Sequence, residues 1–520
     1  MTFYEMHDAV GATRDCYAEV QRWIDATGIA GLQRRMEEAE AIFRRIGITF
    51  AVYGEGGDPE RLIPFDLLPR VFSRMEWQRL DAGIRQRAQA LNAFLYDVYH
   101  RGEIMRAGLI PQELVYGNAA YRPEMIGFDP PGRVYSHIVG IDIVRTGPET
   151  FEVLEDNCRT PSGVSYMLEN REIMTRMFPE LFQHGLVTPV DNYPALLLQT
   201  LKEVAPPACK GDPVVVLLTP GSLNSAYYEH SFLADLMGIE LVEPMDLFVD
   251  AGRVWMKTTA GPMAVDVIYR RIDEMYLDPE VFRRDSYVGV PGLMRAWRRG
   301  KVALVSAPGS GIADDKAVYA FVPEIIRYFL SEEPILPNVP TWRCGDPDDC
   351  AFVLAHLDAL VVKPANESGG YGVVIGPTAG AEALALVARR IEQFPPNWVA
   401  QPVLSLSTMP TLCDGDVAPR HVDLRPFALL SPAGAYVTSG GLTRVARTAG
   451  SLIVNSSQGG GSKDTWIVDA TLADLDDPVA SDDPVASDDP GVKTLASAPP
   501  EVARHGSDRP LRIEGWELAQ

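Results

Sequence analysis

Apolar residues recur at steps of three and four through the segment 83–100, GIRQRAQALNAFLYDVYH. The positions on one predicted face are Ile84, Ala88, Leu91, Leu95 and Val98. This spacing is typical of an amphipathic helix. We therefore predict that region 1–130 is mainly helical, with a boundary near the proline- and glycine-rich FDPPGRV.

Two apolar stretches flank the turn-forming hexapeptide RTGPET at 145–150. They predict a β-hairpin. With the turn centred on Gly147 and Pro148, Asp142 is expected to face Val153. Glu155 and Asn157 would then share the face of Asp142, because side chains alternate along a strand. Two carboxylates and an amide oxygen suit Mg²⁺. A solvated acidic edge is the alternative interpretation.

The pattern changes in segment 213–244. A continuous apolar run, PVVVLL, is followed by a helical pattern ending at Gly238 and by a second short apolar run, IELVE. This order predicts a β-α-β unit with parallel strands. The segment AVDVIYRRIDE adds a strand, and we expect the stretch from Tyr276 to Arg299 to be helical.

Segment 301–330 predicts a strand, a Gly-Pro-Ser loop and a helix in which Pro323 produces a kink. Lys316 falls in the first helical turn, after the candidate caps Asp314 and Asp315. Its side chain would either extend over the surface or reach a phosphate. The loop is not a Walker A motif, because G-x-x-x-x-G-K-[ST] is absent.

Lys363 ends an apolar strand, and a glycine-rich loop with Gly369, Gly370 and Gly372 follows. Such a loop is either an ordinary hairpin turn or a mobile cover for phosphates. Further on, RHVDLRPFALL and GAYVTSGGLTRVA predict antiparallel strands. Their residues Arg425 and Arg444 would remain surface charges or converge on an anionic substrate.

The amino-acid composition indicates which classes of protein this chain can belong to. The 520 residues are 46% hydrophobic and 22% charged, with a net charge of −23. This balance predicts a globular chain without a nucleic-acid surface. We expect no membrane span and no signal peptide, and scattered cysteines favour a reducing cytoplasm. The acidic repeat DDPVASDDPVASDDP predicts disorder in the tail, 471–520.

Taken together, the motifs resemble the circularly permuted type 2 ATP-grasp family, related to the synthetase domain of glutathionylspermidine synthase. The resemblance extends from Arg61 to Trp466, and its strongest segments are VLEDNCRTPSG, GSGIADDKAVYAFVPEI, VVKPANESGGYGV, RHVDLRPFAL and IVNSSQGGGSKDTW. It implies an α+β or α/β chain with a circularly permuted ATP-grasp fold and a Rossmann-like β-α-β pre-ATP-grasp region. The expected parts are a helical region at 1–130, a metal-binding hairpin part at 131–190, the β-α-β domain at 191–310, an ATP-binding part at 311–470 and the tail.

The resemblance also implies residue roles. The metal ligands are expected at Asp142, Glu155 and Asn157, and the ATP contacts at Lys316, Lys363, the glycine loop and Gln401. There is one departure. The related synthases carry an arginine two residues before the metal-binding aspartate, and here that position is Gly140. Arg444, Arg270 and Arg271 are the candidate catalytic replacements.

We therefore expect an ATP- and Mg²⁺-dependent ligase that joins a carboxylate to an amine through an acyl phosphate. Its partners would be small-molecule or peptide substrates, with neither nucleic acid nor membrane. The alternatives are a nucleotide-binding scaffold without catalysis and an ATP-dependent phosphotransferase. The sequence does not indicate the oligomeric state.

Overall fold

The computed structural model describes residues 2–46, 49–51, 60–62, 64–182, 185–367, 372–413, 415–455 and 459–469. Gly369, Gly370 and the predicted disordered tail lie outside these residues, so those predictions stay untested.

The largest sheet has seven strands and carries the acidic hairpin near one edge. Its order is β3-β20-β19-β18-β4-β5, and β17 pairs with β18. The strands are β3 (Phe65–Ser73), β4 (Ile138–Arg145), β5 (Phe151–Asn157), β17 (Thr408–Cys413), β18 (Asp416–Ser431), β19 (Gly434–Val445) and β20 (Gly461–Val468). β20 and β3 are parallel, whereas the other pairs are antiparallel.

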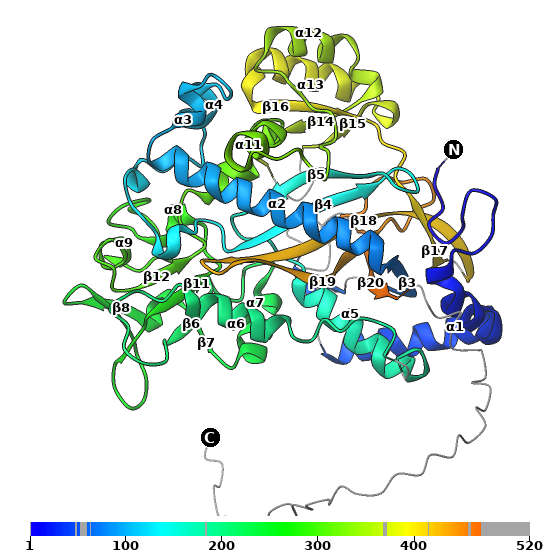
Figure 1. Ribbon diagram of the computed structural model, residues 1–520, viewed down its shortest axis with the longest axis horizontal. Helices are drawn as coiled ribbons and strands as arrows, with labels where there is room; N and C mark the ends of the chain where they lie inside the picture. The colour runs from blue at the N-terminus through cyan, green and yellow to red at the C-terminus, as the bar shows by residue number, and fades with distance from the viewer. Residues whose placement is uncertain are drawn as a thin grey trace, which may run out of the picture. The chain divides into compact units, whose positions relative to one another are not determined.

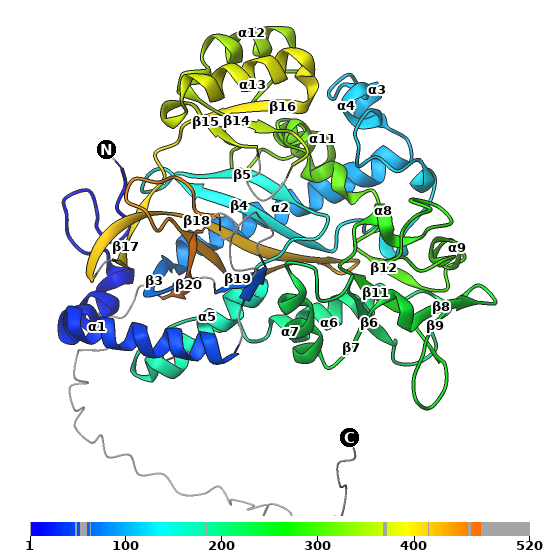
Figure 2. The same cartoon turned by 180° about the vertical axis from the view of Figure 1, so that it is seen from behind.

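Helices cover both faces of this sheet. Figure 1 shows α2 (Arg74–Tyr99) crossing in front of it, and Figure 2 shows the sheet from the opposite side. The predicted apolar face of α2 is buried in one core, together with Ile141 and Val153 from the sheet. The other core packs Phe65 and Phe427 with residues of α1 (Ala18–Ile46), α5 (Val164–Met177) and α6 (Tyr193–Glu203). Ser73 and Glu76 form a capping box that fixes where α2 begins.

A second sheet of four parallel strands has the order β12-β11-β6-β7. Its strands are β6 (Val215–Leu218), β7 (Glu240–Val242), β11 (Val267–Arg270) and β12 (Ala303–Val305), and α7 (Tyr227–Met237) connects β6 to β7. Gly238 ends α7 with a φ of 64°, a left-handed conformation that glycine adopts without strain. The β-α-β unit expected from segment 213–244 is therefore present.

A third sheet has the order β13-β16-β14-β15 and carries Lys363 and Gln401. Its strands are β13 (Trp342–Arg343), β14 (Leu360–Pro364), β15 (Val374–Ile375) and β16 (Trp398–Pro402), which pack with α12 (Pro347–Ala355) and α13 (Ala381–Gln393). Smaller elements complete the described chain: β1 (Thr49–Ala51), β2 (Glu60–Leu62), β8 (Leu247–Asp250), β9 (Arg253–Met256), β10 (Met263–Ala264), α3 (Glu103–Arg106) and α4 (Gln112–Tyr116).

Two local predictions were wrong. The stretch 276–299 is not one helix but two short ones, α8 (Glu274–Leu277) and α9 (Leu293–Arg298). The Asp278 carboxylate accepts hydrogen bonds from the amides of Glu280, Gly292 and Met294, which closes a loop between the helices. Pro323 does not kink a helix. It lies in the first turn of α11 (Val322–Leu330), after the separate helix α10 (Lys316–Tyr319).

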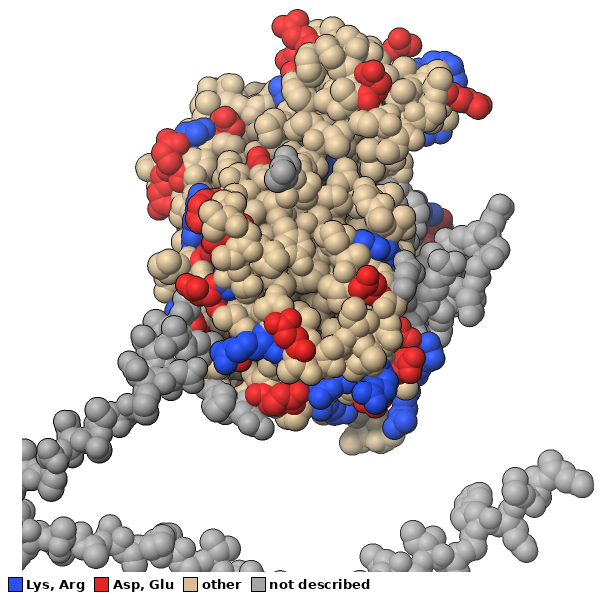
Figure 3. Space-filling view, turned by 90° about the vertical axis from the view of Figure 1, so that its right-hand side faces the viewer, with Lys and Arg blue, Asp and Glu red and all other residues tan. Residues whose placement is uncertain are grey.

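Among the described residues, no helix is both long and apolar enough to span a membrane. On the face shown in Figure 3, acidic and basic side chains are interspersed, mostly around the margin.

The N-terminal segment is anchored by a buried carboxylate. Glu5 is fully buried and accepts hydrogen bonds from Arg70 on β3 at 2.5 and 3.1 Å and from Ser407 at 2.5 Å, while Arg145 on β4 lies 3.5 Å away. Burial alone would raise the pKa of Glu5, but the two arginines overcome it and lower the pKa to about 2.

We predict that Glu5→Ala lowers the free energy of unfolding by roughly 3–5 kcal/mol, because it leaves the buried Arg70 without its carboxylate partner, whereas Arg145 keeps its pair with Glu76. Urea unfolding at pH 7 measures the difference. The difference should shrink as the pH falls from about 4.5 toward 2, where Glu5 becomes protonated in the folded wild type. Glu19→Ala, in an exposed pair with Arg22, is the control and should change stability by less than about 0.5 kcal/mol. An equal effect of both variants would contradict the prediction.

Candidate functional site

The acidic hairpin is formed by β4 and β5. Asp142 lies directly opposite Glu155, and a register shift follows, so that Ile143 pairs with Val153. The predicted pairing of Asp142 with Val153 was therefore wrong, because an extra residue, Leu154, bulges from β5. The bulge brings Leu154 and Glu155 to the same cavity as Asp142.

Asp142 is held by two arginines from neighbouring strands. Arg425 on β18 binds it with two hydrogen bonds of 2.5 and 2.7 Å, and Arg444 on β19 adds a third of 2.8 Å. Asp423 on β18 pairs directly with Arg444 across the strands. Burial alone would raise the pKa of Asp142, but these guanidinium groups hold it well below its usual range.

Lys316 reaches the site from the first position of α10. Asp315 caps this helix, since its carboxylate accepts the amides of Ala317 and Val318. The Nζ atom of Lys316 donates to the carbonyl of Glu367 at 2.6 Å and lies 3.5 Å from Glu155. The side chain is largely buried, so it does not extend over the surface.

Lys363 lies at the end of β14, facing the same cavity. Its Nζ donates to Gln401 Oε1 at 2.6 Å, and Gln401 in turn donates to Thr341 at 3.0 Å. Burial lowers the pKa of Lys363 to about 8, a shift that nearby Glu155 partly opposes.

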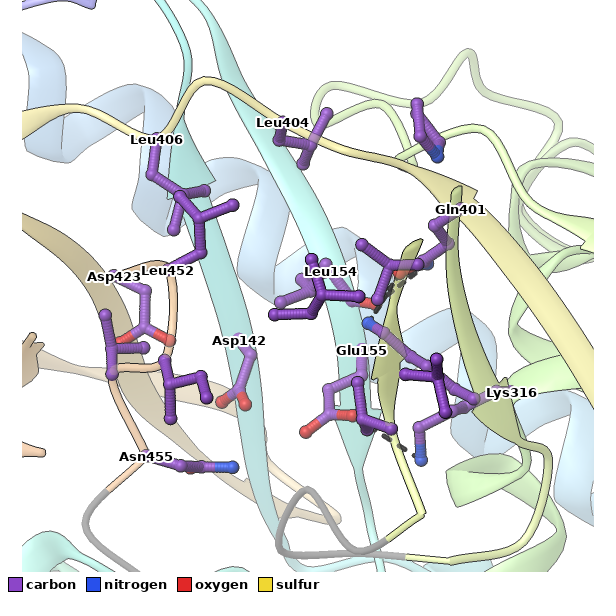
Figure 4. A pocket seen from close by; sticks show the side chains of 18 of the residues that line it. Asp142, Leu154, Glu155, Lys316, Gln401, Leu404, Leu406, Asp423, Leu452 and Asn455 are labelled. Carbon is purple, nitrogen blue, oxygen red and sulfur yellow. Dashed lines mark hydrogen bonds and ion pairs between the residues drawn. The ribbon is translucent and has the colours of Figure 1, made fainter. Parts of the chain in front are cut away.

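A cavity of about 430 Å³ lies among these elements, within the usual range for small-molecule sites. Its polar lining includes Asp142, Glu155, Lys316, Lys363, Gln401, Asp423 and Arg444. Figure 4 shows leucines, including Leu404, Leu406 and Leu452, in the upper part of the view. Asp142, Glu155, Lys316 and Asn455 lie in the lower part. The cavity therefore has an apolar end and a charged end. Such a cavity suits a ligand that has an apolar part and a charged part.

The charged end carries side chains of both signs. Lys316, Lys363 and Arg444 line it together with the carboxylates of Asp142, Glu155, Glu367 and Asp423. The two lysines could bind an anionic group there.

The donor set suits a hard divalent cation. Asp142 and Glu155 offer carboxylate oxygens on opposed strands, and Asn157 Nδ2 donates to the carbonyl of Gly140 at 3.3 Å, which leaves its Oδ1 as an acceptor. No cluster of three or more His, Cys, Asp or Glu side chains able to hold a metal occurs in the described part of the chain. A cation here would thus complete its shell with the amide oxygen, water or phosphate.

The structure does not bring every predicted residue to the cavity. Arg270 is fully buried against Glu274, and Arg271 is buried against Glu229. Both arginines instead bind neighbouring loops. Arg270 donates to the carbonyl of Ser306, after β12, at 2.6 Å, and Arg271 donates to the carbonyl of Pro161, between β5 and α5, at 2.9 Å. Gly372 lies beyond β14 with a φ of 72°, and an added Cβ would come within 2.9 Å of Pro364.

Two residues of the site, Asp423 and Asn455, were not predicted, whereas Arg425 was considered together with Arg444. Asp423 and Arg425 share a face of β18 because they are two positions apart, a signal present in the segment DLRP. Asn455 accepts from Arg444 at 2.7 Å. Only its place in a polar glycine-rich loop could have suggested it.

Comparisons with known proteins identify the family of this chain. The family model of the circularly permuted ATP-grasp type 2 proteins matches residues 69–446. An uncharacterized protein from Synechocystis sp. is 50% identical over 467 residues, covering 90% of this chain and 97% of the relative. An uncharacterized Mycobacterium tuberculosis protein is 49% identical, covering 90% of this chain and 84% of the relative.

A protein from Frankia alni, provisionally named glutamate–cysteine ligase 2-3, is 44% identical over 89% of this chain, but the match spans only 53% of that relative. Among solved structures, a glutathione synthetase-like effector from Globodera pallida shares the fold, with a TM-score of 0.54 and 10% identity over 84% of this chain and 96% of the effector. The mixed α/β architecture with several sheets is consistent with these matches, and family membership implies ATP binding. The chain belongs to the circularly permuted type 2 ATP-grasp family.

Proposed function

We propose that this protein is an ATP-dependent ligase that joins a carboxylate to an amine through an acyl phosphate. The observation that supports this proposal most strongly is the arrangement of Lys316 and Lys363 around one cavity with Asp142 and Glu155. Ammonium groups and a carboxylate pair on neighbouring elements are what a magnesium-bound triphosphate requires.

In this proposal the apolar end of the cavity takes the adenine, near Gln401 and Leu404. Lys316 and Lys363 bind the phosphate chain and offset its charge. Asp142, Glu155 and Asn157 hold Mg²⁺, which neutralises charge on the phosphates when bound. Arg444 stays at the charged end, fixed by Asp423 and Asn455.

The reaction then has two steps. A carboxylate oxygen of the first substrate attacks the γ-phosphorus of ATP, and the bond to the bridging oxygen breaks to release ADP. An amine next attacks the carbonyl carbon of the acyl phosphate, loses a proton, and phosphate leaves. The basic side chains stabilise the negative charge that develops on the transferred group.

The name of the Frankia relative describes the same class of bond, between a carboxylate and an amine. About half of that relative lies outside the match. The name therefore supports the reaction class for this chain and does not transfer its substrates.

An assay of trapped intermediates tests the reaction class. The full chain is incubated with MgATP, a panel of amino acids and small peptides, and hydroxylamine in place of the amine. Formation of a hydroxamate together with an equal amount of ADP supports an acyl phosphate. A stable phosphorylated acceptor without hydroxamate would indicate the phosphotransferase, and ATP binding without ADP across the panel would indicate the scaffold.

We predict that Glu155→Gln reduces the rate of ADP formation by roughly a hundredfold or more, because the cation and the phosphates lose a charged partner. Glu152→Gln is a matched control on the same strand, since Glu152 binds Thr146 and does not line the cavity. It should leave the rate within about twofold. Full activity of Glu155→Gln would remove Glu155 from the mechanism.

Affinity for MgATP should also depend on pH through Lys363. The pKa of about 8 means that the side chain is charged at pH 7 and mostly neutral at pH 9 in the empty site. Phosphate stabilises the charged form, so binding above pH 8 takes up a proton. Affinity should be constant below about pH 7 and fall by up to about tenfold per pH unit above 8.

Calorimetric titration with a non-hydrolysable ATP analogue measures this dependence. In Lys363→Met the affinity should be lower at pH 7 and nearly independent of pH between 7 and 9. A wild-type affinity that stays flat across this range would exclude Lys363 as a phosphate ligand.

A further inference from the structure

We propose that Arg425 is an internal counter-ion that holds Asp142 and Glu155 together until a divalent cation binds them, and that the cation displaces its guanidinium group. This inference rests on the proposed function, because it assumes that these two carboxylates are the metal ligands.

The guanidinium of Arg425 already occupies both oxygens of Asp142. Nε lies 2.5 Å from Oδ1 and Nη2 lies 2.7 Å from Oδ2, and the same Nη2 is 3.8 Å from Glu155. Asp142 is almost completely buried, whereas Glu155 and Arg425 are 22% and 15% exposed. Two opposed carboxylates this close need a positive group between them, and Arg425 provides it.

The backbone makes room for this arrangement at Gly140. Leu424 pairs with Ile143 and Phe427 with Gly140, so Arg425 lies beside Asp142 on the adjacent strand. A Cβ at position 140 would come within 3.5 Å of Arg425 Cδ and 2.9 Å of Pro161 Cβ. The aliphatic stem of Arg425 therefore lies over the space that a side chain at position 140 would need.

A dication would compete with the Arg425 guanidinium for Asp142. Arg425 contacts both carboxylate oxygens and Arg444 contacts one of them, so few lone pairs are left for the cation, and its two charges would repel the guanidinium at a distance of a few ångströms. Arg444 still balances Asp142 after Arg425 leaves, since it binds the carboxylate independently at 2.8 Å. The pair thus has a second counter-ion that keeps Asp142 in place while Arg425 moves.

The displaced guanidinium remains at the charged end of the site. Its Nη1 already lies 3.3 Å from the carbonyl of Ser162, on the loop between β5 and α5. Arg425 released from Asp142 would present its donors to an anionic group bound there. In this way one arginine serves as a counter-ion in the empty site and as an anion contact in the loaded site.

Manganese titration of the full chain tests the inference without relying on activity. Free Mn²⁺ is followed by electron paramagnetic resonance, with and without a non-hydrolysable ATP analogue. In Arg425→Gln, Mn²⁺ should bind about tenfold or more tightly without nucleotide, because a competing positive charge is gone. In Arg425→Lys, which keeps the charge but not the two-pronged contact, the gain should be smaller.

Arg420→Gln is the matched control on β18. Its guanidinium donates hydrogen bonds to the carbonyls of Arg447 and Pro419, away from Asp142 and Glu155, so Mn²⁺ affinity should not change. Unchanged or weaker Mn²⁺ binding by Arg425→Gln would overturn the inference. If Glu155→Gln also leaves Mn²⁺ affinity unchanged, the metal assignment itself fails and the inference with it. If Glu155→Gln loses Mn²⁺ binding but Arg425→Gln shows no gain, the metal assignment stands and only the role proposed for Arg425 fails.

Crystals of the wild-type chain soaked in Mn²⁺ keep the inference testable if Arg425→Gln does not fold. An anomalous peak between Asp142 and Glu155, with Arg425 no longer bonded to both oxygens of Asp142, would support it. Arg425 still bound through both contacts beside the metal, or a metal bound elsewhere, would overturn it.

Discussion

The site depends on a row of charged side chains across four neighbouring strands, in which arginines pair with buried carboxylates. Arg444 on β19, Asp423 and Arg425 on β18, Asp142 on β4 and Glu155 on β5 form one row. A carboxylate as buried as Asp142 would be neutral without partners, since burial penalises the charged form. The two arginines keep it ionised, and an ionised carboxylate is the form that a divalent cation binds.

The cationic side of the cavity is built from different parts of the chain. Lys363 is carried by the sheet that packs with α12 and α13, whereas Lys316 is fixed by the capped start of α10. A backbone hydrogen bond from Lys316 to Ala365, of 3.0 Å, joins these two parts. The positions of the lysines relative to the acidic row thus depend on tertiary contacts, not on either segment alone.

The sequence pattern predicted those features that depend on neighbouring residues, such as strand alternation and helix capping. The alternation in β4 and β5 placed Asp142 and Glu155 on one face, and Asp315 was recognisable as a cap. The exact register was not predictable, because the bulge at Leu154 forms only against β4.

Arg270 and Arg271 looked like free arginines in the sequence. In the folded chain, Arg270 pairs with Glu274, four residues further on, and Arg271 pairs with Glu229 from α7. The sequence alone does not show these pairings. The order of the five motifs was more informative than any one of them, and it led to the family.

A crystal structure of the chain with a non-hydrolysable ATP analogue and Mg²⁺ tests the central claim most directly. We expect the triphosphate to lie between the Nζ atoms of Lys316 and Lys363 and the carboxylates of Asp142 and Glu155, with the adenine against Leu404. A triphosphate bound elsewhere, or bound in this cavity without contact to either lysine, would contradict the proposed site.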